Sequence, residues 1–367
     1  MKERLDCAVI GGGVVGLAIA RKLALQGRQV VLFEAERATG MHTSSRNSEV
    51  LHAGIYYPTG SLKARLCVEG RRMLQGYCQG RGITWRRIGK IVVASSEAEI
   101  PMLEHYKAQG HTNGVEELAW LEREQVRELE PSVLCVRALA SPATGLIDSH
   151  GLMQALAADA RNAGADIVLG SPVKGGEIAD GGIDLDLGGN DGARFGFRTV
   201  VNAAGFFAPA VACTLRGLDA KFVPMPYFAR GHYFTVSGPS PFKRLVYPLP
   251  GSDGLGIHVA LDLAGNLRFG PDVTWVDAVN YAFDESRADA FYRAIRRYYP
   301  GLADGALAPG FVGVRPKLGP AGSGFIDFVL QGREVHGVPG LLNLFGIDSP
   351  GLTSCLALAD EVAGRLD

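Results

Sequence analysis

A glycine-rich turn close to the N-terminus is the first feature of this sequence that could do chemistry. Residues 11–16 read GGGVVG, which contains the pattern G-x-G-x-x-G. Such glycines let backbone amides approach a pyrophosphate, and a helix that starts there adds free N–H groups and a partial positive charge. The pattern therefore predicts a dinucleotide site that includes Gly11, Gly13, Val14, Val15 and Gly16.

The residues around this turn have the order that a dinucleotide site requires. The apolar run at 5–10 predicts a strand, the spacing of 14–26 predicts a helix, and 29–33 predicts a second strand. Glu34, followed by Ala35, ends this strand about twenty residues after the turn, where a carboxylate can accept hydrogen bonds from ribose hydroxyls. The alternative, a glycine-rich surface turn beside an ordinary Glu, explains this order less well.

Two later segments also place small residues at a strand end or a helix start. Residues 199–205 (TVVNAAG) end a predicted strand with Ala203, Ala204 and Gly205. Residues 346–353 (GIDSPGLT) place a proline in the first turn of a predicted helix, whose N–H groups could stabilise the negative charge of a reduced flavin ring. Three such features in one chain favour FAD over NAD as the cofactor.

The composition argues against several classes of protein. The 367 residues include 37 basic and 38 acidic ones, a net charge of −1, so nothing favours a nucleic-acid partner. The six cysteines form no C-x-x-C pair and no zinc-like spacing, so we expect no metal and a reducing compartment, the cytoplasm. No apolar window approaches the roughly eighteen residues of a membrane span. Peripheral association, for example at an inner membrane, stays open.

The order of the predicted elements indicates an α/β fold with two interleaved domains. Short alternating strands between 173 and 205 replace the crossover helix of a nicotinamide dehydrogenase, and the charged stretch 97–130 reads as solvated helix. We predict a Rossmann-like FAD-binding domain with a β-meander insertion and an α+β substrate domain built on an antiparallel sheet. The predicted FAD-binding domain comprises 1–85, 150–215 and 311–367, and the predicted substrate-binding domain comprises 86–149 and 216–310.

Several longer segments resemble one family of flavoenzymes. These are HTSSRNSEVLHAGIYYPTGSLKARLCVEG (42–70), YFARGHYF (227–234), LVYPLP (245–250), GIHVALD (256–262), GVRPKLGPAG (313–322) and FIDFVL (325–330). Together they resemble the D-amino-acid-oxidase-type FAD superfamily, which includes glycine oxidase, sarcosine oxidase and glycerol-3-phosphate dehydrogenase. Within it, the sequence is most similar to the L-2-hydroxyglutarate dehydrogenase/oxidase family. Glu49 and Asp348 depart from the usual pattern of that family.

The resemblance implies an activity and a set of cofactor contacts. The activity would be oxidation of a 2-hydroxy acid to a 2-keto acid. Val173 would border the adenine, and the start of the last helix would face the pyrimidine edge of the isoalloxazine ring through Gly351, Leu352 and Thr353. The polar residues that would lie along the pyrophosphate and flavin are Thr43, Ser44, Ser45, Arg46, Asn47 and Ser48.

Oxidation of an alcohol next to a carboxylate needs a base and a carboxylate clamp beside the flavin. Histidine suits the base because it titrates near neutral pH. His258 is the first candidate and His52 the second, and His52 could instead contact the flavin or attach it covalently. Arg315 could bind a carboxylate through two parallel hydrogen bonds and also touch the cofactor. Further substrate contacts are expected from Tyr57, Arg230, Tyr247, His258 and Lys317.

Two other functions stay open at this level. The same fold could oxidise an amino acid or a secondary amine, for which no base is required. A flavin-binding protein without catalysis would hold the cofactor but would not be reduced by any small acid. The sequence also leaves open which 2-hydroxy acid is used, whether oxygen, a quinone or another protein accepts the electrons, and how many subunits assemble.

Overall fold

The N-terminal β–α–β unit sets the position of the glycine turn. The structure is a computed structural model that describes residues 4–188, 192–249 and 256–366. In it β1 (Leu5–Ile10), α1 (Val14–Leu25) and β2 (Val30–Phe33) follow the predicted order. β1 pairs in parallel with β2 on one side and with β12 (Arg194–Asn202) on the other. The turn therefore lies at the carboxyl edge of the sheet, where open α/β sheets bind nucleotides.

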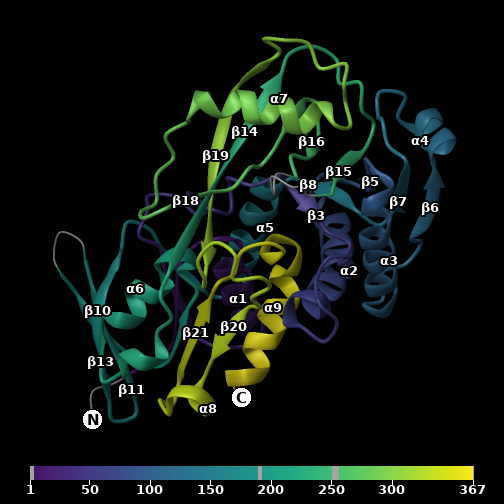
Figure 1. The fold of residues 1–367 in the computed structure, drawn as a ribbon. Coiled ribbons are helices and arrows are strands. Elements are labelled where there is room, and N and C mark those ends of the chain that lie inside the picture. The colour runs from purple at the N-terminus through teal and green to yellow at the C-terminus, as the bar shows by residue number, and fades with distance from the viewer. Residues whose placement is uncertain (1–3, 189–191, 250–255, 367) are drawn as a thin grey trace.

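This unit belongs to a nine-stranded sheet that forms one half of the molecule (Figure 1). Its other strands are β9 (Asp166–Val168), β10 (Val173–Ala179), β11 (Gly182–Leu187), β13 (Leu215–Arg216), β20 (Val329–Gln331) and β21 (Leu341–Phe345). The order is β13-β10-β11-β12-β1-β2-β9, and β21 pairs with both β12 and β20. β9, β2, β1, β12 and β21 pair in parallel, whereas β10, β11 and the start of β12 form an antiparallel meander. The predicted α/β class with a meander in place of a crossover helix is confirmed.

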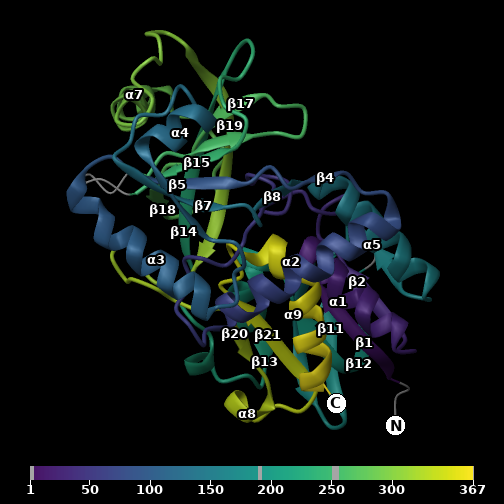
Figure 2. The ribbon, with the colours of Figure 1, turned by 90° about the vertical axis from the view of Figure 1, so that its right-hand side faces the viewer.

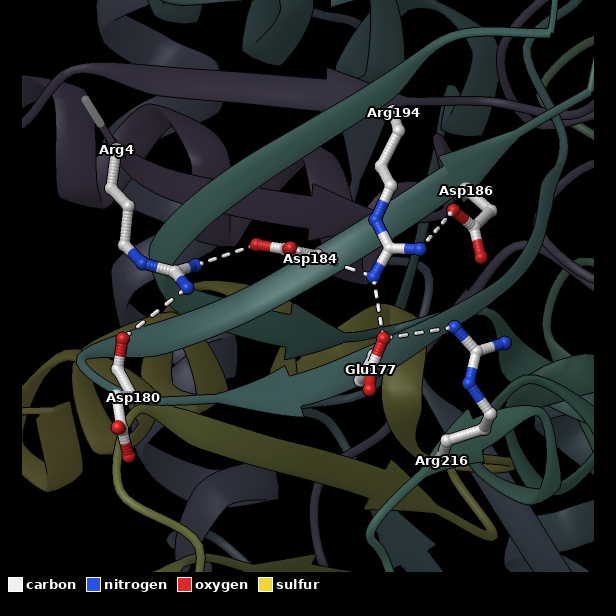
Figure 3. A network of polar contacts seen from close by, with 7 residues as sticks. All are labelled: Arg4, Glu177, Asp180, Asp184, Asp186, Arg194 and Arg216. Carbon is white, nitrogen blue, oxygen red and sulfur yellow. Dashed lines mark hydrogen bonds and ion pairs between the residues drawn. The ribbon is translucent and has the colours of Figure 1, made fainter. Parts of the chain in front are cut away.

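The meander separates an apolar face from a charged one. Alternate β11 side chains enter the core, while Asp184 and Asp186 point outward. Figure 3 shows these carboxylates in a network with Arg4 and Arg194, in which Arg4 Nη1 lies 2.8 Å from Asp184 Oδ1 and Arg194 Nη2 lies 2.8 Å from Glu177 Oε2. Because the pairs bridge β10, β11 and β12, the network supports the register of the meander.

Four helices cover one face of this sheet. They are α1, α2 (Leu62–Arg81), α5 (Ser149–Asn162) and α9 (Gly351–Leu366), and Figure 2 shows them side by side. Ser61 caps α2 by accepting a hydrogen bond from the Ala64 N–H, as N-cap serines commonly do. A Cβ at Gly70 would lie 2.4 Å from the carbonyl oxygen of Thr353, so the glycine lets α2 approach the start of α9 closely. That approach positions the N-terminus of α9.

A second sheet forms the other half of the molecule. Its strands run in the order β18-β14-β17-β16-β15-β5-β7-β6, and β19 pairs with β14. The strands are β5 (Lys90–Ala94), β6 (Ala119–Glu122), β7 (Arg137–Ser141), β14 (Tyr227–Val236), β15 (Leu245–Pro248), β16 (Val259–Leu261), β17 (Leu267–Phe269), β18 (Thr274–Val276) and β19 (Leu307–Lys317). All its pairings are antiparallel except β5 with β15. The predicted boundary between 310 and 311 falls inside β19, which pairs with β14 along its length.

Shorter elements complete the structure. The stretch 97–130, expected to be helical, contains α3 (Ile100–Thr112) and α4 (Arg123–Leu129) but also β6, which pairs with the edge of β7. A third, small antiparallel sheet consists of β3 (Val50–Leu51), β8 (Gly145–Ile147) and β4 (Trp85–Arg86), in that order. The remaining helices described are α6 (Ala208–Cys213), α7 (Ala288–Arg296) and α8 (Arg333–His336). Within the described ranges, no helix has the length and apolar character needed to cross a membrane.

Candidate active site

A cavity of about 780 Å³ is lined by residues of both halves of the molecule. Its walls come from the carboxyl ends of β1, β2 and β12, the loop at 40–50, β14 and β19, and the segment 347–353. Predicted cofactor residues that line it are Gly11, Gly13, Val14, Val15, Glu34, Ala35, Thr43, Ser44, Arg46, Asn47, Ser48, His52, Val173, Ala203, Ala204, Gly205, Arg315, Gly351, Leu352 and Thr353. Tyr247 and His258 line the same cavity.

The glycine turn has the geometry of a cradle for an anion. Gly11 has φ +106, and a Cβ there would lie 2.6 Å from the carbonyl oxygen of Ala203. A Cβ at Gly16 would lie 1.9 Å from the Gly11 carbonyl oxygen, so this glycine lets α1 start directly against the turn. Among the described residues, the N–H groups of Val15 and Gly16 have no hydrogen-bond partner outside α1, so the helix N-terminus is available to a diphosphate.

Glu34 closes the other side of this cradle. The side chain is buried, and its Oε2 accepts a hydrogen bond from the Gly12 N–H at 2.6 Å, while Oε1 accepts one from the Glu36 N–H at 2.8 Å. These bonds hold the carboxylate at the end of β2, in the wall of the cavity that Val173 of β10 also lines. Carboxylate oxygens have further lone pairs, so Glu34 can still accept hydrogen bonds from ribose hydroxyls.

The loop after β2 is held by its own side chains. Ser44 Oγ accepts a hydrogen bond from the Val14 N–H at 3.0 Å, and Asn47 Nδ2 donates to the Ser44 carbonyl at 2.8 Å. Glu49, one of the two departures from the family pattern, has φ +56, and its Oε1 accepts a hydrogen bond from Ser149 Oγ at 2.8 Å. Glu49 therefore anchors the end of the loop to α5, which explains an acidic residue at this position.

The segment before α9 is fixed by a buried ion cluster. Asp348, the second departure, is 6% exposed and lies 2.8 Å from Lys63 Nζ and 2.5 Å from Lys317 Nζ. Thr353 Oγ1 accepts a hydrogen bond from the His52 N–H at 3.0 Å and donates one to the Val50 carbonyl at 3.2 Å. These contacts hold the start of α9 against β3 and against His52, which follows directly after it.

The two predicted histidines lie at one end of the cavity. Burial, aided by the charge of Lys90, lowers the pKa of each to about 3, so both imidazoles are neutral near pH 7. His258 stacks on Tyr247 with 3.6 Å between ring centres. His52 Nε2 lies 3.4 Å from Ser349 Oγ, and its buried Nδ1 has no partner among the described residues. Either neutral ring can accept a proton from a bound hydroxyl.

Arg315 reaches the same end of the cavity from β19. Its Nη2 donates a hydrogen bond to the Asp272 carbonyl at 3.0 Å, which fixes the direction of the guanidinium. Asp272 is itself held, because its carboxylate accepts hydrogen bonds from the His232 N–H at 2.7 Å and from Arg287 Nε at 2.8 Å. A guanidinium fixed in this way can bind a carboxylate through two donors.

Five predicted site residues do not line the cavity. Gly16 lies in the first turn of α1, behind the glycine turn. The Ser45 hydroxyl donates a hydrogen bond to the His42 carbonyl within its own loop. Lys317 is paired with Asp348, and Tyr57 OH lies 3.3 Å from Ser349 Oγ outside the wall. Arg230 alternates with Gly231 and Tyr233 on β14, and it is these neighbours that face the cavity. Arg230, Tyr57 and Lys317 therefore do not line the cavity, and the substrate contacts expected of them stay predictions.

The cavity is also lined by residues that were not predicted, among them Tyr233, Ser349 and Asp272. Tyr233 hydrogen-bonds Ser48 Oγ at 2.8 Å, Ser349 contacts His52, and Asp272 holds Arg315. Tyr233 could have been found only by placing Gly231, and not Arg230, on the cavity face of β14, since strand residues alternate. Asp272 and Ser349 carry no comparable signal, since they act through loops that only the folded chain brings together.

Comparison with known proteins gives a consistent picture. Residues 6–365 match the family model described as FAD dependent oxidoreductase. The mitochondrial L-2-hydroxyglutarate dehydrogenase of Arabidopsis thaliana is 43% identical over 99% of this chain and 84% of its own length, and the human one is 32% identical over 99% and 89%. The solved structure of L-alpha-glycerophosphate oxidase from Mycoplasma pneumoniae with FAD bound has a TM-score of 0.88 and 26% identity, covering 99% of this chain and 95% of that one.

Proposed function

This chain belongs to the FAD dependent oxidoreductase family, the premise from which we propose that it oxidises L-2-hydroxyglutarate to the 2-keto acid. The observation that carries the proposal is the meeting of two neutral histidines and one oriented arginine at a single end of a cofactor-sized cavity. A base and a carboxylate clamp side by side are what a 2-hydroxy acid requires. The 43% identical relative named for this activity supports the same assignment.

FAD is the cofactor, and the residues present fit it. The amides of Val15 and Gly16 would hold the diphosphate, Glu34 the ribose, and the start of α9 the flavin ring. A bound flavin supplies an acceptor for the hydride that leaves the substrate carbon. The protein does the rest: it removes the hydroxyl proton, orients the carbon and excludes water.

We call the end of the cavity that holds His52, His258 and Arg315 the chamber, and one of its two histidines takes the hydroxyl proton. His258 is our first choice because it stacks on Tyr247 and so has a fixed ring plane, and it lies in the chamber with Arg315. Its lowered pKa keeps a lone pair free near pH 7, and the negative charge of a bound substrate would raise that pKa towards the range that suits a general base. His52 is held at its backbone by Thr353 and has an unpartnered buried Nδ1, which makes it the second choice.

Arg315→Met is expected to raise KM for L-2-hydroxyglutarate about 100-fold while kcat changes far less. Two charge-assisted hydrogen bonds to the substrate carboxylate are lost, and together they contribute about 3 kcal/mol. Arg315→Lys should recover only part of the loss, since an ammonium cannot bind in the same forked geometry. Steady-state kinetics measure the split; a fall in kcat at unchanged KM would contradict the clamp role.

Anaerobic mixing tests the proposed function directly. The purified yellow holoenzyme is mixed with L-2-hydroxyglutarate, shorter 2-hydroxy acids, 2-amino acids and N-methylated amino acids, and flavin absorbance is followed. Bleaching by L-2-hydroxyglutarate at the lowest concentration supports the proposal. Bleaching by amines alone would assign the chain to amine oxidation, and a flavin that none of them reduces would point to a binding protein without catalysis.

A further inference from the structure

A buried lysine lies directly behind the proposed base. Lys90, the first residue of β5, is 2% exposed. Its Nζ lies 4.4 Å from the ring centre of Tyr56 and 4.6 Å from that of Tyr247, so the ammonium is held between two aromatic faces. Tyr247 in turn stacks on His258. The charge is therefore one ring away from the chamber in which the substrate would lie.

No acidic group among the described residues neutralises this lysine. No carboxylate oxygen there comes within 4.0 Å of Lys90 Nζ, although the other buried lysine, Lys63, is paired with Asp348. The groups that face Lys90 are the phenols of Tyr56 and Tyr247, the thiol of Cys67 and the two histidines. Burial raises the pKa of the Cys67 thiol to about 12 and also raises the pKa of both phenols, so all three groups are uncharged near pH 7.

An unpaired ammonium in the interior is unfavourable to folding. Aromatic faces offset only part of the lost hydration, and burial lowers the pKa of Lys90 to about 7. A methionine of similar length would fill the same space without that cost. The rest of β5, residues 91–94, is apolar and fully buried, so the strand itself gives no reason for a charge. The position therefore points to an anion that arrives from outside.

The chamber is where such an anion would sit. The charge of Lys90 already reaches both histidines. Burial is the largest cause that lowers the pKa of His52 and of His258, and the Lys90 charge is the second largest for each. The same field attracts a negative charge placed beside those rings. Through the low effective dielectric of an interior, this attraction is expected to be on the order of tenfold in affinity per ligand charge.

We propose that Lys90 is a buried counter-charge that favours a doubly charged substrate anion in the His258 chamber without touching it. The proposal rests on the proposed function, since L-2-hydroxyglutarate carries two carboxylates. Lys90 is thus a specificity-determining residue that acts through the Tyr247–His258 stack. Arg315 holds one carboxylate by contact, and Lys90 adds an attraction that grows with the total charge of the ligand.

The pH dependence follows with a definite sign. The free protein carries the Lys90 charge below about pH 7 and loses it above. Affinity for a dicarboxylate is therefore full on the acid side and falls as the pH rises through that value. An anion bound in the chamber favours the charged lysine, so binding near pH 7.5 should take up a proton.

The test uses holoenzyme of wild type, Lys90→Met and Lys107→Met. Lys107 also lies over an aromatic ring, that of Trp120 at 5.9 Å, but it does not line the cavity, so its replacement controls for loss of a lysine–ring contact. Kd is measured from the perturbation of the flavin spectrum by glutarate, a non-oxidisable dicarboxylate, and by pentanoate, a monocarboxylate of equal length. Melting temperature and proton uptake by calorimetry are measured on the same samples.

We expect Lys90→Met to weaken the binding of glutarate by roughly 100-fold and that of pentanoate by roughly tenfold. The variant should also lose the pH dependence of binding and the proton uptake, and its melting temperature should not be lower than that of the wild type. Lys107→Met should match the wild type. Equal losses for both ligands with a lower melting temperature would assign Lys90 a structural role. Unchanged glutarate affinity in Lys90→Met, when L-2-hydroxyglutarate does reduce the wild-type flavin, would overturn this proposal alone. A wild-type flavin that L-2-hydroxyglutarate fails to reduce would overturn the proposed function.

Discussion

Replacement of His258 by alanine is expected to slow flavin reduction by L-2-hydroxyglutarate by 10²–10⁴-fold, the usual contribution of a general base. The ring is neutral because burial lowers its pKa to about 3, and the same burial removes water that could take the proton instead. Rapid mixing under anaerobic conditions measures the rate. Since both histidines titrate far below their usual range, the wild-type rate should show no loss of activity near pH 6.5.

His52→Ala is the comparison for this prediction. If His52 is only a neighbour of the base, its loss should slow reduction much less than the loss of His258. A large loss in His52→Ala with a nearly normal His258→Ala would reverse the two roles. Both variants should stay yellow and bind glutarate within a few fold of the wild type, because Arg315 is untouched. Rapid reduction in both would remove the case for a histidine base.

Gly11→Ala is expected to yield a protein that purifies without FAD, with affinity for the added cofactor lowered by about 100-fold or more, about 3 kcal/mol. A Cβ at Gly11 would lie 2.6 Å from the Ala203 carbonyl oxygen, and φ there is +106. The turn could relieve this only by moving away from the end of β12, which withdraws the amides that approach the diphosphate. Fluorescence titration of the apoprotein with FAD measures the effect.

Gly27→Ala is the matched control. Gly27 has φ +84, so alanine there meets similar backbone strain, but a Cβ would contact nothing within 4 Å. Both variants should lose roughly 1–3 kcal/mol of stability from the strained φ. Only Gly11→Ala should lose the cofactor. FAD affinities of the two variants within tenfold of each other would show that strain, and not the contact with Ala203, is responsible.

The electrostatics of the site explain why His52 and His258 stay uncharged at physiological pH. Burial is the largest cause of each shifted pKa at the chamber, for His52, His258 and Lys90 alike. A wall that excludes water thus sets the protonation state of the base before any substrate arrives. Because the same wall excludes water, an incoming carboxylate loses its hydration and needs a fixed cation to offset that loss. Arg315 would supply this cation by direct contact.

The sequence by itself determined the nucleotide half and its cofactor. The turn at 11–16, its flanking strand and helix, and Glu34 are close together along the chain, so local spacing specifies their geometry. The meander was predictable for the same reason, because alternation along β11 is a local pattern. Motif order also identified the family, since each motif is a short continuous segment.

Only the tertiary structure decided which polar side chains reach the chamber. Strand alternation turned Arg230 away and brought Tyr233 in, and Lys317 was taken by Asp348. Lys90 looks like any strand residue in the sequence, yet β15 brings Tyr247 and hence His258 against it. The physical reason is that burial, pairing and charge depend on neighbours distant in sequence, whereas a glycine turn depends mainly on residues next to one another.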